Sequence, residues 1–279
     1  MSSSLICEFF QVKEIKKESS DVFSLWLQNP KKKNLNFKAG QFNMLYVPGV
    51  GESAISISGD SKNKKIFQHT IRVVGDVTRS LSMLKKNHWV GLRGPFGESW
   101  DLRPAFKKNL IIIAGGIGIA PLRPLILDAL KVKSRFKKIY LLYGTREEKD
   151  LLFKKDLKLW QKQGIEVLCT VDRVDVVKSA AKRWRGSVGV VSKLLNFVDC
   201  DFKEAAAYLC GPDVMMRFTI ADLLKLGVPN EKIFVTLERH MKCAVKLCGR
   251  CQMREYFLCG HGPVFPYEKV ATHMRNKEL

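Results

Sequence analysis

The chain has 279 residues, 46% of them hydrophobic, and its 48 basic and 27 acidic side chains give a formal net charge of +21. Its length suggests about two domains plus a small appendage, and its hydrophobic content allows a sizeable globular core. No apolar run is long enough to span a bilayer and no secretory signal begins the chain, so we expect a cytoplasmic protein without a membrane span.

The first hundred residues are expected to form short strands divided by turns. Partial alternation or β-branched enrichment predicts strands at 22–27, 42–47, 55–58 and 66–74. Turn dipeptides such as Asn29-Pro30 and Pro48-Gly49 lie between them. Many short strands with this punctuation predict a closed antiparallel β-barrel.

Two segments of this barrel resemble the flavin domain of ferredoxin–NADP reductase-like proteins. They are FKAGQFNML (37–45) and ESAISIS (52–58). The resemblance implies that Ile55 and Ser56 lie against the isoalloxazine of FAD. The arginine that the family uses for the FAD phosphate is replaced by Ser53 here, and an ordinary strand remains the alternative for the second segment alone.

A third segment, GDVTRSLSML (75–84), adds a Gly-x-x-Thr pattern that resembles the second flavin element of that family. Thr78 is expected to cap a short helix whose apolar positions are Leu81 and Leu84. The amides of such an N-terminus suit a pyrophosphate, and Arg79 can add charge. Arg72 is another candidate near the flavin, although simple surface placement remains open for both arginines.

From about residue 107 the pattern changes to strands alternating with helices. Short apolar runs predict strands at 110–114, 139–143, 166–171, 206–210 and 233–236, with helices at 124–132, 151–163 and 214–226. This alternation predicts an α/β, doubly wound parallel sheet covered on both faces, with ligands at the carboxyl ends of the strands.

The first of these strands leads into AGGIGIAPLRPLI, in which Gly115, Gly116 and Gly118 let the backbone approach a pyrophosphate. This GGxGxAPL form resembles ferredoxin–NADP reductase-like proteins, as do GLRGPFG (91–97) and YGTREEKDLLF (143–153). The CGPDVM segment resembles the turn that the family places beside the nicotinamide. That resemblance implies a cofactor-binding role for Gly211 and Pro212 and makes Cys210 a catalytic candidate.

The choice between NADH and NADPH depends on the end of the third strand, TVDR. Asp172 there resembles the acidic residue that binds a free ribose, whereas Arg173 suits a 2′-phosphate. We therefore expect NAD(P)H binding with NADH favoured.

Four cysteines near the C-terminus, Cys243, Cys248, Cys251 and Cys259, have the spacing C-x4-C-x2-C-x7-C. On an ideal helix the first three would face no common point, whereas a loop with Gly249 lets them curl around one small object. Their spacing resembles the plant-type pattern for a [2Fe–2S] cluster. The alternatives are a zinc site, cysteines without a ligand role, and cysteines that form disulfide bonds.

The order of these parts resembles flavin- and iron–sulfur-containing electron-transfer subunits of dihydroorotate dehydrogenase, of sulfhydrogenase-type hydrogenases and of anaerobic sulfite reductase. The resemblance implies an FAD-binding barrel at 1–101, an NAD(P)-binding domain at 102–236 and a cluster-binding extension at 237–279. Electrons would then pass between NAD(P)H, FAD and the cluster to or from a partner redox subunit or a ferredoxin. Cys210 and Glu238 are candidates for positioning the nicotinamide, with a buried thiol and a surface acid as the alternatives.

A free-standing ferredoxin–NAD(P) reductase and a zinc-binding scaffold of the same fold are the other functions considered. Basic residues in the cysteine loop, together with the net charge, suggest that the partner is acidic at the contact. The densest other basic stretches are scattered and lack interleaved aromatic residues, which argues against nucleic-acid binding. They are Lys31–Lys33, Lys133–Lys138 and Lys182–Arg185.

Overall fold

A computed structural model of the chain describes residues 5–31, 34–174, 184 and 186–275. Most of the basic stretches Lys31–Lys33 and Lys182–Arg185 therefore lie outside the described residues. The chain divides into two compact units. One comprises residues 1–100, 120–128 and 237–264, and the other comprises residues 101–119, 129–236 and 265–279.

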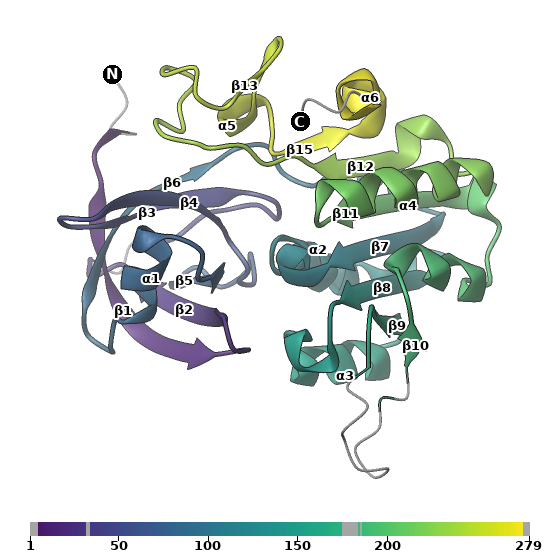
Figure 1. Cartoon of the computed structure of the whole chain (residues 1–279), viewed down its shortest axis with the longest axis horizontal. Helices are drawn as coiled ribbons and strands as arrows, with labels where there is room; N and C mark the ends of the chain where they lie inside the picture. The colour runs from purple at the N-terminus through teal and green to yellow at the C-terminus, as the bar shows by residue number, and fades with distance from the viewer. Residues whose placement is uncertain (1–4, 32–33, 175–183, 185, 276–279) are drawn as a thin grey trace. The chain divides into compact units, whose positions relative to one another are not determined.

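The first unit contains an antiparallel barrel, drawn in purple and blue in Figure 1. Within the described residues its six strands follow the order β4-β3-β6-β1-β2-β5. An antiparallel bridge between Ile57 and His69 joins the two edges, so the sheet closes as the sequence predicted. The strands are β1 (Glu8–Lys17), β2 (Val22–Gln28), β3 (Phe42–Val47), β4 (Gly51–Ser56), β5 (Ile66–Arg72) and β6 (Trp89–Phe96).

Two of these strands, β1 and β6, were not predicted, and β4 overlaps the predicted range 55–58 only at its last two residues. The inward side chains of the barrel form one apolar core that includes Leu25, Leu45, Phe67 and Ile71. The GLRGPFG segment, one of those that resemble ferredoxin–NADP reductase-like proteins, supplies most of β6 and pairs with both β1 and β3.

The short helix α1 (Asp76–Ser82) corrects the expected role of Thr78. The N-cap residue is Gly75, and Thr78 occupies the third helical position. Its buried hydroxyl accepts hydrogen bonds from the backbone N–H groups of Val74 and Gly75 and donates to the Gly75 carbonyl. Thr78 therefore closes the turn before the helix, and Leu84 lies beyond the helix end.

The second unit contains a parallel sheet in the order β10-β9-β8-β7-β11-β12-β15 among the described residues (Figure 1). From β7 the chain adds β8 and β9 on one side and β11 and β12 on the other, which confirms the doubly wound topology. The strands are β7 (Asn109–Gly115), β8 (Ile139–Thr145), β9 (Glu166–Val171), β10 (Ser187–Val188), β11 (Ala205–Cys210), β12 (Ile233–Thr236) and β15 (Val264–Pro266).

Three of the helices that follow these strands were predicted, and their ends agree to within three residues except at the start of α2, which begins five residues earlier than predicted. They are α2 (Ile119–Lys131), α3 (Lys154–Lys162) and α4 (Asp213–Lys225), and α6 (Tyr267–Arg275) was not predicted. Short 3₁₀ helices cover Arg103–Ala105, Gly116–Gly118, Lys133–Arg135, Glu148–Asp150, Val191–Phe197, Phe202–Glu204 and Asn230–Lys232. Within the described chain, none of the helices combines the length and the apolar character that a bilayer crossing needs.

Residues 237–264 belong to the first unit and lie against its barrel. They contain β13 (Gln252–Met253), β14 (Tyr256–Phe257) and α5 (Leu258–His261). The backbone N–H of Leu237 donates to the Pro263 carbonyl at 2.9 Å, which brings the two ends of the segment together. The four cysteines of the C-x4-C-x2-C-x7-C pattern therefore lie in a closed loop.

Candidate functional site

The cysteine loop has an irregular backbone around its first three cysteines. Ala244, Lys246 and Gly249 have φ values of 63°, 60° and 73°, in the left-handed region that a helix does not visit. The chain can therefore turn its amides inward. This agrees with the prediction of a loop in place of a helix.

Several of these amides point at sulfur. The Sγ atom of Cys243 accepts backbone N–H groups from Val245 at 3.4 Å, Leu247 at 3.2 Å and Cys248 at 3.4 Å. The Sγ atom of Cys259 accepts the N–H of Lys246 at 3.2 Å. Hydrogen bonds of this kind stabilise thiolates and tune iron–sulfur clusters.

The pKa values of the thiols follow from these contacts. Burial alone would raise the pKa of Cys243, but the N–H donors of Val245, Cys248 and Leu247 outweigh it and lower the value to about 7. Burial and the neighbouring thiol of Cys251 together raise the pKa of Cys259 to about 12, although the hydrogen bond from the N–H of Lys246 acts to lower it. Cys243 is thus prepared as an anionic ligand, while Cys259 requires a bound cation to lose its proton.

The four thiols lie close enough to influence one another. Cys248 lowers the pKa of Cys243, whereas Cys251 and Cys243 both raise the pKa of Cys259. Among the described residues, no group of three histidine, cysteine, aspartate or glutamate side chains converges as a site for one metal ion. Four thiols gathered in one loop, with backbone N–H groups directed at two of the sulfurs, suit a [2Fe–2S] cluster, which takes four protein sulfurs.

The glycine-rich turn after β7 lies beside the turn after β11, where the strand order reverses. A Cβ at Gly118 would lie 2.6 Å from the carbonyl carbon of Cys210, and one at Gly211 would lie 3.0 Å from Gly115 Cα. The two turns therefore meet backbone to backbone. Because α2 and α4 both begin at this edge, their N-terminal amides face the position where an open α/β sheet binds a dinucleotide.

The acidic residue that organises the end of β8 was missed in the sequence. Glu147 binds Arg173, with Nη2 to Oε1 at 2.7 Å, and also forms an ion pair with Lys149. Hydrogen bonds from Lys149 and Arg173 lower the pKa of Glu147. Asp172 is fixed through its backbone N–H, which donates to the Thr145 carbonyl. Arg173, the residue that weakened the NADH prediction, is thus held by a carboxylate.

In the barrel, the expected flavin residues lie on or near β4 and α1. Ile55 is half-buried and packs against the barrel core, and Ser56 is half-buried at the end of β4. Arg79 is exposed, and Arg72 forms an ion pair with Asp21, with Nε to Oδ2 at 3.2 Å. The contacts of these four expected flavin residues with FAD stay predictions.

A histidine that the sequence did not single out supports this strand. Burial lowers the pKa of His69 to about 4, so its ring is neutral. Its Nδ1 lies 3.0 Å from the Ser56 carbonyl, and its Nε2 lies 3.1 Å from the side-chain amide of Asn43. A neutral ring that donates from Nδ1 and accepts at Nε2 satisfies both contacts and fixes the end of β4.

The two candidates beside the nicotinamide differ in exposure. Cys210 ends β11 with a side chain that is 3% exposed. Glu238 follows β12 and has an exposed side chain, although partial burial of its carboxyl raises its pKa. Their roles toward the nicotinamide stay predictions.

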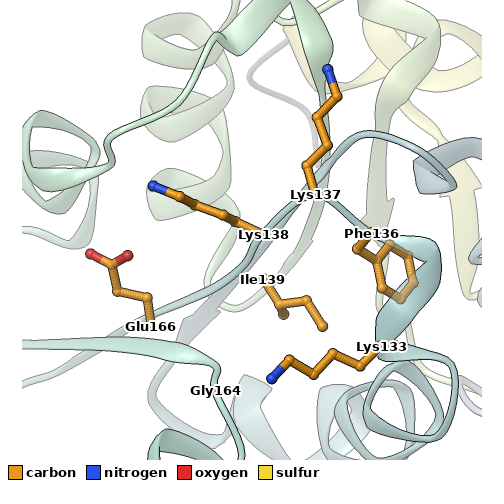
Figure 2. Close-up of a pocket in the computed structure, with 7 residues that line it drawn as sticks. All are labelled: Lys133, Phe136, Lys137, Lys138, Ile139, Gly164 and Glu166. Carbon is orange, nitrogen blue, oxygen red and sulfur yellow. The ribbon is translucent and has the colours of Figure 1, made fainter.

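A surface pocket of about 220 Å³ lies at the amino ends of β8 and β9, next to Ile139 and Glu166. Figure 2 shows that Lys137 points away from the other two lysines of the pocket, Lys133 and Lys138. The pocket is smaller than the roughly 300 Å³ or more of typical ligand sites, and it lies at the sheet edge opposite the dinucleotide position. We assign it no role in cofactor binding.

Two family descriptions match the chain. Residues 112–220 match the oxidoreductase NAD-binding domain, and residues 238–271 match the iron–sulfur cluster binding domain of dihydroorotate dehydrogenase B. The gamma subunit of sulfhydrogenase 2 from Pyrococcus furiosus is 35% identical over 269 residues and 92% of each chain. A probable dihydroorotate dehydrogenase B (NAD(+)) electron transfer subunit from Archaeoglobus fulgidus is 31% identical over 258 residues, covering 92% of this chain and 96% of the relative.

The chain belongs to the family of these subunits. Solved structures agree on the fold of this family member. A structure described as an NADH-dependent reduced ferredoxin–NADP oxidoreductase has a TM-score of 0.74 and 23% identity, covering 96% of this chain and 94% of its own. A ferredoxin NADP+ reductase from Neisseria gonorrhoeae with bound FAD and NADP has a TM-score of 0.69 and 18% identity, covering 82% and 97%.

These comparisons confirm the predicted family and fold, and with them the predicted role as a redox electron-transfer subunit. The family matches confirm the predicted NAD-binding and iron–sulfur cluster binding domains, whereas binding of FAD by the barrel stays a prediction that the shared fold supports. The residues that contact each cofactor stay proposals.

Proposed function

We propose that the chain carries electrons between NAD(P)H, FAD and a [2Fe–2S] cluster, as a cytoplasmic subunit of a larger redox complex. Residues 1–101 would hold the flavin, 102–236 the nicotinamide and 237–279 the cluster. The observation that carries this proposal is the loop of four cysteines, fixed to the barrel, in which backbone N–H groups are directed at the sulfurs of Cys243 and Cys259. The family match to an iron–sulfur cluster binding domain over residues 238–271 supports it.

When bound, the flavin would supply two-electron exchange with the nicotinamide and the cluster would supply single-electron exchange with a partner. Residues of the chain bind and orient these groups. Gly115, Gly116 and Gly118 leave backbone amides open to a pyrophosphate, with Gly211 and Pro212 forming the facing turn. Ser56 and Ile55 would lie beside the flavin, Arg72, Thr78 and Arg79 near its phosphates, and Asp172 at the ribose.

NADH is expected to support turnover better than NADPH. Protein reconstituted anaerobically should reduce an artificial dye, and its kcat/KM for NADH should exceed that for NADPH by about tenfold, because Glu147 neutralises the arginine that would bind a 2′-phosphate. Glu147→Gln releases Arg173 and should narrow this ratio. Glu148→Gln, the same change one residue on in the chain, should leave the ratio unchanged.

Three results would contradict these statements. Protein without flavin absorbance and without dye reduction would contradict the proposed function. A higher kcat/KM for NADPH in the unmodified protein would contradict the NADH assignment. An unchanged ratio in Glu147→Gln would exclude the Glu147–Arg173 ion pair as the cause of the preference.

The exposed part of the cysteine loop is proposed to meet an acidic surface of the partner subunit. Lys242, Lys246, Arg250 and Arg254 all have exposed side chains around the exposed Cys248. A basic rim around a redox centre can accelerate association with an acidic partner at rates that fall steeply with salt. Solubility of the loop is the alternative role of these side chains.

Charge reversal separates these roles. Lys246→Glu with Arg250→Glu should slow electron delivery to the physiological partner by about tenfold or more at low salt, because the encounter loses its attraction. NADH-to-dye turnover should be nearly unchanged, since dye reduction needs only the flavin. Lys154→Glu with Lys158→Glu on α3 makes the same change in net charge and should affect neither rate. If electron delivery and dye reduction both slow in the Lys246→Glu, Arg250→Glu variant, the proposal that these side chains attract an acidic partner is wrong.

A further inference from the structure

Arg93 is a buried cation in the barrel wall. It lies on β6, its side chain is 6% exposed, and it pairs with Glu52 of β4. The Nη2 atom lies 2.7 Å from Glu52 Oε1, and Nε lies 3.2 Å from Oε2. This two-point contact orients the guanidinium plane, because each edge of the fork has a fixed direction.

The remaining donors of the guanidinium reach the cysteine loop. Nη1 donates to the carbonyl of Cys243 at 3.0 Å, and Nη2 donates to the carbonyl of Lys242 at 3.2 Å. Arg93 and Cys243 are 150 residues apart in the chain. The arginine thus binds the main chain of the first cysteine of the loop, whose sulfur accepts the N–H groups of the residues that follow it.

The end of β6 holds the other end of the loop. The backbone N–H of Glu98 donates to the Gly262 carbonyl at 2.6 Å. A Cβ at Gly97 would lie 2.8 Å from that same carbonyl oxygen, so the two backbones approach closely. Gly262 follows Cys259, the last cysteine, by three residues. One short segment of the barrel therefore fixes the loop at both ends.

We propose that Arg93 is a positioning residue for the iron–sulfur cluster: it fixes the main chain at Cys243 and so sets the direction of that ligand. The inference rests on the proposed function, since it requires a cluster in the loop. Lysine cannot replace the arginine, because one ammonium lacks a planar fork that binds a carboxylate and two carbonyls together. Glu52 holds the guanidinium in the orientation that both carbonyls need.

The test uses the full chain, reconstituted anaerobically with FAD, iron and sulfide. Arg93→Gln and Arg93→Lys are compared with Arg123→Gln, which removes a part-buried arginine that donates to the Ser58 carbonyl, away from the cysteine loop. Three measurements are made on each protein. They are the electron paramagnetic resonance spectrum of the dithionite-reduced cluster, the rate of iron loss to a chelator, and NADH-to-dye turnover.

Both Arg93 variants should show an altered cluster spectrum and lose iron about 10- to 100-fold faster, the usual effect of removing a residue that orients a metal ligand. Their dye turnover should stay that of the unmodified protein, and Arg123→Gln should retain the unmodified cluster spectrum and iron-loss rate. An unmodified spectrum and iron-loss rate in Arg93→Lys would overturn the proposal. Loss of flavin together with iron in both Arg93 variants would also overturn it, because Arg93 would then only stabilise the barrel. An unmodified protein without any iron–sulfur signal would instead contradict the proposed function.

Discussion

Replacing Cys248 by serine should abolish or strongly reduce cluster occupancy. The unmodified protein, isolated anaerobically, should contain about two irons per chain. Cys248 is one of the four cysteines that would hold the cluster, and its replacement would leave a hydroxyl, a poor ligand for iron, in place of one thiolate. Metal analysis and the visible spectrum measure this directly.

The matched control for this variant is Cys200→Ser. Cys200 lies outside the loop and is not one of the four cysteines of the C-x4-C-x2-C-x7-C pattern. Iron content should be unchanged in this control. Zinc in place of iron in the unmodified protein, isolated under conditions that preserve clusters, would contradict the [2Fe–2S] assignment.

Replacing Gly118 by alanine should destabilise the edge of the parallel sheet at which a dinucleotide is expected to bind. The added methyl group would lie 2.6 Å from the carbonyl carbon of Cys210 and 2.9 Å from the N of Gly211, which are backbone atoms with little freedom to move. We expect a loss of about 3 kcal/mol in the free energy of unfolding and a large loss of NADH affinity. Urea titration and NADH binding measure the two effects.

Gly115→Ala is the matched comparison, three residues earlier in the same turn. Its methyl group would meet the flexible end of the Met215 side chain and Pro212 Cδ at 3.0 Å. The side chain can move away, so we expect a smaller loss, of about 1 kcal/mol. Equal losses in the two variants would show that the close approach of Gly118 to Cys210 does not limit stability.

The parallel sheet was predictable because its strands are continuous apolar runs. The predicted strands 166–171 and 233–236 coincide with β9 and β12. The barrel was harder to predict. β6 contains two glycines and a proline, which normally break strands, and β1 has charged side chains along its exposed face. These strands form because neighbours from elsewhere in the chain pair with them, and a single stretch of sequence does not show those neighbours.

The residues of the candidate site also differ in how well the sequence predicted them. The cysteines were found because their spacing within 17 residues carries the chemistry. Arg93, His69 and Glu147 were missed because each acts through a residue distant in sequence. Thr78 was predicted as the cap of a helix but occupies its third helical position, because its hydroxyl can satisfy the turn from within the helix as well as from before it.

The attachment of the cysteine loop to β6 also sets an order of assembly. The barrel strands are synthesised before the cysteine loop, and the contact between Arg93 and Cys243 spans 150 residues. The loop can therefore make this contact only after β6 has taken its place in the barrel. We expect iron insertion to follow closure of the barrel, so a shortage of iron should leave a folded barrel with an unfilled loop.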